Sequence, residues 1–222
     1  MHFDSIVRKT EAFVKTHLSG DSTGHDWWHI QRVLKTALSI AEQESSVDLF
    51  VIRLAALLHD IDDWKFSDGD EMAAARQARS WLVGLEVEEG IVKQVCEIVA
   101  NVSFKGAGVK NMMKCREGKI VQDADRLDAL GAIGIARAFS YGGFKGQALH
   151  DPSTGPQYHS NFEEYKNSGG STINHFHEKL LLLEDQMNTD SGRRIARTRT
   201  EFMETFLNQF HAEWHGKDLT DG

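Results

Sequence analysis

Apolar residues recur every three or four positions along most of the chain, which is the spacing of amphipathic α-helices. This spacing predicts helices over residues 3–18, 30–41, 49–59, 70–83, 91–99, 120–139, 173–187 and 195–214. Asp48 stands where the N-cap of the third helix is expected, and Gly84 where the fourth should stop. No segment alternates convincingly between apolar and polar residues, as a half-buried strand would. The pattern therefore predicts an all-α protein.

The third predicted helix is apolar almost all round, so we expect it to be the central buried helix. It runs directly into His59 and Asp60. A buried carboxylate needs a charged partner, hydrogen bonds or a metal ion, because removing its charge from water is costly. The alternative is that Asp60 simply ends the helix and hydrogen-bonds locally. Neighbouring residues on a helix point about 100° apart, so this pair shares one ion only at the rim of a pocket.

Residues 140–171 interrupt the helical pattern with six glycines and with both prolines of the chain, Pro152 and Pro156. Such a long irregular segment in a compact protein is either functional or mobile, and we interpret it as a lid over a site. The length of 222 residues favours one domain. We expect a single domain over residues 1–222, with a core at about 20–140, the lid-like loop at 140–171 and C-terminal helices at 172–215.

Composition excludes several classes of protein. The 25 basic and 33 acidic residues give a net charge of −8, which is unlike a dedicated binder of nucleic-acid polymers. The two cysteines make neither a disulfide framework nor a thiolate metal cluster. No apolar run approaches the roughly 18 residues of a membrane span, and the first residues do not resemble a secretion signal. We therefore expect a cytoplasmic protein without a membrane role.

A second group of carboxylates lies in the predicted helix over residues 120–139. Asp123, Asp125 and Asp128 fall within six residues, and Asp125 and Asp128 stand one turn apart on the same side of the helix. A solvated acidic face is the simple explanation. Arg126, whose guanidinium fork suits phosphate, favours a metal and phosphate site instead.

Taken in order, His29, the pair His59-Asp60, and Asp125 resemble the H…HD…D signature of the HD-domain metal-dependent phosphohydrolases. Residues 24–33, 57–63 and 120–134 resemble the family's three motif blocks, and residues 173–181 are similar to a subgroup of small bacterial HD hydrolases. The resemblance covers roughly residues 20–210. An HD pair alone is a weak signal, whereas four blocks in order are specific. The resemblance implies an HD-domain helical bundle.

The resemblance also implies the metal ligands, which would be His29, His59, Asp60 and Asp125. A mixed set of nitrogen and oxygen ligands suits Mn²⁺, Fe²⁺, Co²⁺, Ni²⁺ or Zn²⁺ and argues against a calcium cage. Mn²⁺ is the ion we favour, and Mg²⁺ is a further alternative. Dinuclear members of the family carry further histidines between the HD pair and the last aspartate. This chain has no histidine between His59 and His150, so one divalent ion is expected.

Beside Asp60, Asp63 is the candidate to accept a proton from the attacking water or to orient it, since on a continuing helix it shares a face with His59. A helix-end carboxylate is the alternative. Lone lysines are usually only solvated, and the tryptophans Trp27, Trp28 and Trp64 are more typical of core than of base stacking. The candidates for binding the phosphorylated substrate are Arg32, Lys65, Ser103, Lys105, Arg126, His175 and Lys179.

Within the subgroup, the implied activity is hydrolysis of nucleoside or deoxynucleoside triphosphates to monophosphate and pyrophosphate. A phosphatase acting on nucleoside monophosphates or other small metabolites is an alternative, and so is a non-catalytic HD scaffold that senses nucleotides. The presence of all four ligands and Asp63 argues against the scaffold. The apolar face of the last helix, with Phe202, Phe206 and Phe210, either completes the core or pairs subunits in a homodimer.

Overall fold

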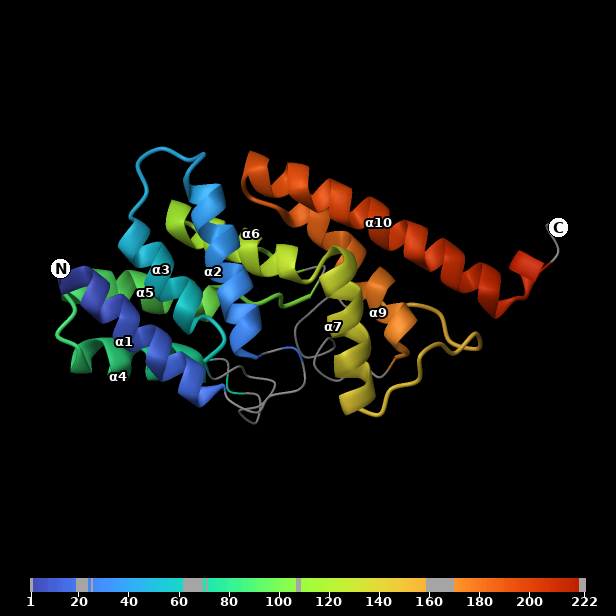
Figure 1. Ribbon diagram of the computed structural model, residues 1–222, viewed down its shortest axis with the longest axis horizontal. Helices are drawn as coiled ribbons and strands as arrows, with labels where there is room; N and C mark the ends of the chain where they lie inside the picture. Colours follow the sequence, from blue (N-terminus) through green and yellow to red (C-terminus); the bar gives the residue numbers. More distant parts are fainter. Residues whose placement is uncertain are drawn as a thin grey trace. The chain divides into compact units, whose positions relative to one another are not determined.

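The computed structural model describes residues 2–18, 24, 26–61, 70, 72–106, 109–158 and 170–219. Over these residues the chain forms helices joined by turns and irregular segments, without a strand, which confirms the all-α prediction (Figure 1). The chain divides into two compact units. Unit 1 comprises Met1–Phe104 and Lys110–Asp125, and unit 2 comprises Lys105–Val109 and Arg126–Gly222. The single domain over residues 1–222 stays a prediction.

Unit 1 is built around a helix that is apolar except for Arg53. Its helices are α1 (His2–His17), α2 (Trp27–Ala41), α3 (Leu49–Leu58), α4 (Ala73–Gly84), α5 (Glu89–Asn101) and the first part of α6 (Arg116–Asp128). Helix α3 packs against α1, α2 and α5, and α4 packs against α5. All five residues from Leu54 to Leu58 are completely buried. This position confirms the prediction that the third helix lies at the centre, and it carries the chain directly to His59.

Side-chain caps set where the helices of unit 1 begin. The side chain of Asp48 accepts hydrogen bonds from Phe50 N and Val51 N, as the sequence predicted. Helix α2 is capped by Asp26, whose side chain accepts from His29 N at 2.9 Å. Helix α4 begins at Ala73, three residues later than predicted, while Asp70 accepts from Met72 N just before it.

The helix predicted over residues 120–139 is two helices. Helix α6 ends at Asp128, and α7 (Gly131–Phe144) begins after a turn. Gly131 has φ of +70°, a left-handed conformation that a glycine adopts without steric strain. The chain thus changes direction here, which the continuous apolar spacing did not reveal. Helix α7 also extends five residues beyond the expected end at 139.

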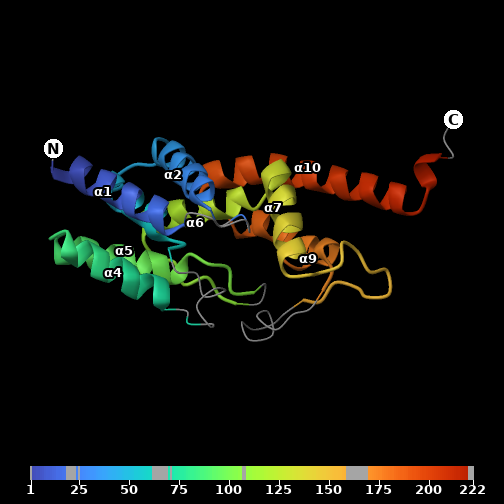
Figure 2. The same ribbon diagram turned by 60° about the horizontal axis from the view of Figure 1, so that its bottom comes forward.

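Unit 2 packs α7, α9 (Thr172–Glu178), the 3₁₀ helix η1 (Leu180–Gln186) and the long α10 (Asp190–Trp214) together, with η2 (Lys217–Leu219) after α10 (Figures 1 and 2). Phe176 is fully buried, and its ring lies 6.0 Å from that of Phe139 and 5.9 Å from that of Phe206. Phe206 therefore completes the core of this unit, whereas Phe202 is exposed. The predicted helix over 173–187 is wrong in its second half, because η1 replaces the α-helix there.

The irregular segment between α7 and α9 begins at Lys145 rather than at 140, because α7 continues through Phe144. The structure describes it up to Tyr158 and again from Gly170, while residues 159–169 lie outside the described residues. The lid stays a hypothesis. Trp27 is half-buried, but Trp28 is 65% exposed, so its assignment to the core is wrong; Trp64 lies outside the described residues. Among the described helices, none is long and apolar enough to cross a membrane.

Candidate metal centre

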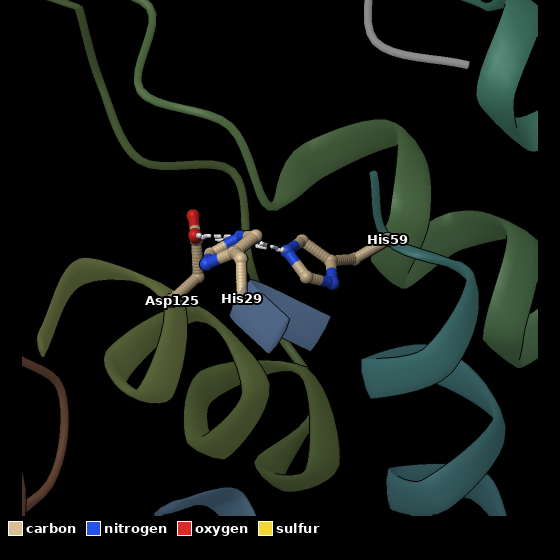
Figure 3. A group of neighbouring side chains, drawn as sticks. All are labelled: His29, His59 and Asp125. Carbon is tan, nitrogen blue, oxygen red and sulfur yellow. Dashed lines mark hydrogen bonds and ion pairs between the residues drawn. The ribbon is translucent and has the colours of Figure 1, made fainter. Parts of the chain in front are cut away.

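Two buried imidazoles face one another inside unit 1. His29 and His59 are 0% and 3% exposed, and their Nε2 atoms lie 3.1 Å apart (Figure 3). His29 comes from the first turn of α2, and His59 is the C-cap residue of α3. Histidines far apart in the sequence are thus brought together because α2 and α3 pack side by side.

Each histidine is anchored by a hydrogen bond, His29 through its backbone N–H and His59 through its ring. The carboxylate of Asp26 holds the N–H of His29 and so anchors the first turn of α2. Nδ1 of His59 lies 2.9 Å from the carbonyl oxygen of Ala56. A carbonyl oxygen only accepts, so Nδ1 carries the hydrogen, and in the neutral ring Nε2 presents its lone pair to His29. This is the arrangement that orients a metal-ligating histidine.

Two carboxylates complete the group. Oδ1 of Asp125, on α6, lies 3.5 Å from Nε2 of His29 and 3.7 Å from Nε2 of His59. Oδ2 of Asp60 lies 3.6 Å from Nε2 of His29. One ligand atom from each of His29, His59 and Asp125 lies within 4.8 Å of the others, which is close enough for one metal ion. The structure therefore brings together three of the four expected ligands, His29, His59 and Asp125, and the carboxylate of Asp60 lies beside His29.

The electrostatics of the group favour a cation. Burial is the largest influence on His59 and lowers its pKa, but the Asp125 carboxylate 3.7 Å away and the charge of Asp60 raise the pKa to about 9. Burial raises the pKa of Asp125, but the nearby His59 imidazole and the charges of both histidines hold the pKa well below its usual range. Two Nε2 lone pairs 3.1 Å apart repel one another unless a proton or a metal ion lies between them. Two imidazoles with carboxylates suit a divalent transition metal, so these residues fit such an ion.

The other candidates are distributed over both units. Arg32 is half-buried one turn after His29, and Ser103 is half-buried two residues after α5. In unit 2, Lys105, His175 and Lys179 are half-buried, and Arg126 is buried. Nη1 of Arg126 donates to the carbonyl oxygen of Gln186, so this guanidinium forms a hydrogen bond inside unit 2. Asp63 and Lys65 lie outside the described residues.

Sequence reasoning missed two supporting interactions. Asp26 was part of a motif block but was not identified as the cap of α2, although a carboxylate three residues before a first-turn residue signals this role. Asp128 forms an ion pair with Arg137 at 3.0 Å, and both side chains are largely buried. Asp125 and Asp128 therefore have different partners. Asp125 lies beside His29 and His59, whereas Asp128 pairs with Arg137 within unit 2.

Comparisons with known proteins agree with this geometry. The HD domain family model matches residues 27–130, which include all four proposed ligands. The uncharacterized protein YpgQ of Bacillus subtilis is 38% identical over 96% of this chain and 95% of its own length. Its crystal structure in complex with ADP is similar to this one, with a TM-score of 0.75 and 35% identity over 96% of this chain and 97% of that chain.

Two further crystal structures cover nearly the whole chain. An HD-superfamily hydrolase of Bacillus thuringiensis is 44% identical, with a TM-score of 0.71 over 96% of this chain and 98% of that one. A protein of Lactobacillus plantarum is 36% identical, with a TM-score of 0.85 over 95% of this chain and 97% of that one. The chain therefore belongs to the HD-domain superfamily of metal-dependent phosphohydrolases, in its bacterial YpgQ-like family.

Proposed function

We propose that the protein hydrolyses nucleoside or deoxynucleoside triphosphates to a monophosphate and pyrophosphate, with one divalent ion at the site formed by His29, His59, Asp60 and Asp125. The observation that carries the proposal is the convergence of two buried imidazole nitrogens and Oδ1 of the half-buried Asp125. Mn²⁺ is the favoured ion, and the mixed set of imidazole and carboxylate also suits Fe²⁺, Co²⁺, Ni²⁺ or Zn²⁺. A cytoplasmic location and a homodimer remain predictions from the sequence.

A bound divalent ion lowers the pKa of a coordinated water and polarises a phosphoryl oxygen. The protein's own contribution is to hold the ligands still. His59 is fixed by its bond to Ala56, and His29 by the cap that Asp26 provides. For the proton of the attacking water, Asp60 and Asp63 are the proposed acceptors, Asp60 because its carboxylate lies beside His29.

The nucleotide substrate class is supported by the relative YpgQ, which was crystallised with ADP. The resemblance of this subgroup to triphosphate pyrophosphohydrolases supports the scissile bond. Candidates for holding the phosphates are Arg32, Lys65, Ser103, Lys105, His175 and Lys179, with Arg126 the weakest because it donates to Gln186.

Product analysis tests the proposal. Metal-stripped protein would be reloaded separately with Mn²⁺, Co²⁺, Ni²⁺, Zn²⁺ and Mg²⁺ and given a panel of nucleoside and deoxynucleoside mono-, di- and triphosphates. Orthophosphate and pyrophosphate would be counted separately. We expect pyrophosphate from triphosphates, in amounts equal to the monophosphate formed.

Each other outcome points to a different function. Orthophosphate from monophosphates would keep the metal site and assign the protein as a nucleotidase. Nucleotide binding without turnover by the metal-loaded protein would favour the sensing scaffold and contradict the proposed activity. Asp60→Ala is the control for background hydrolysis, because it removes one proposed ligand.

A further inference from the structure

A second group of histidines lies in unit 2, where α10 ends. His150, His211 and His215, here called the C-terminal histidine cluster, come from the segment after α7 and from the end of α10. The rings of His150 and His211 have centroids 5.3 Å apart and meet edge to face at 76°. The rings of His29 and His59 in the metal centre have nearly the same arrangement, with centroids 5.1 Å apart at 66°.

His211 and His215 stand one helical turn apart. His215 N donates to the carbonyl oxygen of His211 at 3.2 Å, so the i to i+4 backbone geometry holds up to the end of the helix. Histidines at this spacing share one face and can chelate a single metal ion, as the two histidines of the H-E-x-x-H motif do. This pair alone supplies two of the ligands that a transition-metal site needs.

His150 is held against this end of α10 by aromatic rings. Its centroid lies 4.9 Å from that of Trp214 and 6.0 Å from that of Phe210. Its Nδ1 is shielded from solvent and has no hydrogen-bond partner among the described residues. An unsatisfied buried nitrogen is costly, and coordination of an ion is one way to satisfy it.

A neutral imidazole is the metal-binding form of histidine. Burial first, and then the charges of His211 and His215, lower the pKa of His150, with Asp151 opposing them. His177 on α9 behaves similarly, because burial and the charge of His211 lower its pKa, with Glu178 opposing.

We propose that His150, His211 and His215 bind a divalent ion of the zinc class, separate from the HD metal centre and independent of the proposed hydrolysis. Three imidazoles with water in a fourth position suit Zn²⁺, Co²⁺ or Ni²⁺. Among the described residues only His29, His59 and Asp125 already hold their ligand atoms within 4.8 Å of one another. To bind one ion, the three imidazoles of the cluster therefore come together by side-chain rotation of His211, which is half-buried, and His215, which is exposed. The ion would tie the segment of His150 to α10.

The test counts bound zinc on the full-length protein. Metal-stripped wild type, His211→Gln, His150→Gln and the matched control His17→Gln would be dialysed against Zn²⁺ buffered by a competing chelator, and zinc per chain measured by mass spectrometry. His17 is an exposed histidine of α1. We expect His211→Gln and His150→Gln to bind one ion fewer than wild type, and His17→Gln to bind as many.

Cobalt distinguishes the two sites by geometry. We expect Asp125→Asn loaded with Co²⁺ to keep the intense visible absorption of a four-coordinate ion, and His211→Gln to lose it. Hydrolysis with Mn²⁺ and the helical circular dichroism signal of His211→Gln should match wild type, which shows that the variant folds. Equal zinc content in wild type, His211→Gln and His150→Gln would overturn the proposal, as would loss of all bound zinc in Asp125→Asn.

Discussion

The two histidine groups have similar ring geometry and opposite surroundings. His29 and His59 are buried beside two carboxylates, and the pKa of His59 rises to about 9. His150 lies among aromatic rings and other histidines, and its pKa is lowered. Burial lowers the pKa of both His59 and His150, so the comparison shows that the neighbouring carboxylates decide how strongly an imidazole pair attracts a cation. The group around His29 and His59 already has its ligand atoms close together. In the C-terminal histidine cluster, side chains must rotate before an ion can bind.

The largest expected effect comes from removing a carboxylate of the buried group. Asp125→Asn should lower metal-dependent hydrolysis on the order of a thousandfold, because it removes a ligand charge worth several kcal/mol, at about 1.4 kcal/mol per tenfold. The measurement is hydrolysis at saturating metal. Asp128→Asn is the matched control on the same helix, since Asp128 pairs with Arg137 instead. Comparable losses of hydrolysis in Asp125→Asn and Asp128→Asn would contradict the assignment of Asp125, and not Asp128, as a metal ligand.

The pH dependence of metal binding sharpens the contrast. In the metal-free protein, protonated His59 contributes stability that is fully present below pH 6.5 and is lost as the pH rises through about 9. A metal ion takes the place of that proton, so its binding strengthens over the same range. The melting-temperature gap between metal-loaded and metal-free protein should therefore widen from pH 6.5 to 9. A gap that stays constant or narrows would contradict the assignment.

Much of this fold could be predicted from the periodicity of the sequence, because a helix that buries one face has an apolar residue every three or four positions. The central position of α3 followed from its apolar sequence, and the order of the motif indicated His29, His59 and Asp125, which the structure brings together. The break at Gly131 could not be predicted, since apolar spacing continues through it and only the positive φ shows the turn. Nor could the ion pair of Asp128 with Arg137, because it depends on how α6 and α7 are joined.

A smaller effect is expected from the cap that anchors His29. Asp26→Ala should lower the free energy of unfolding by about 1 kcal/mol, the usual value of an N-cap. It should also weaken metal binding by up to about tenfold, because the first turn of α2 positions a ligand. The control is Asp48→Ala, which removes the equivalent cap of α3 at the end remote from His59. We expect calorimetry to show a similar loss of stability there and an unchanged metal affinity; equal affinity losses would mean that the caps act only through global stability.

The most direct test of the metal centre measures bound metal and nucleotide hydrolysis on the same samples of wild type and Asp60→Ala. Asp60 is buried, and its carboxylate lies 3.6 Å from Nε2 of His29. We expect Asp60→Ala to lose the ion of the HD site and triphosphate hydrolysis together, while the helical circular dichroism signal is kept. A folded Asp60→Ala protein with wild-type metal content and full activity would contradict the assignment of this group as the catalytic metal centre.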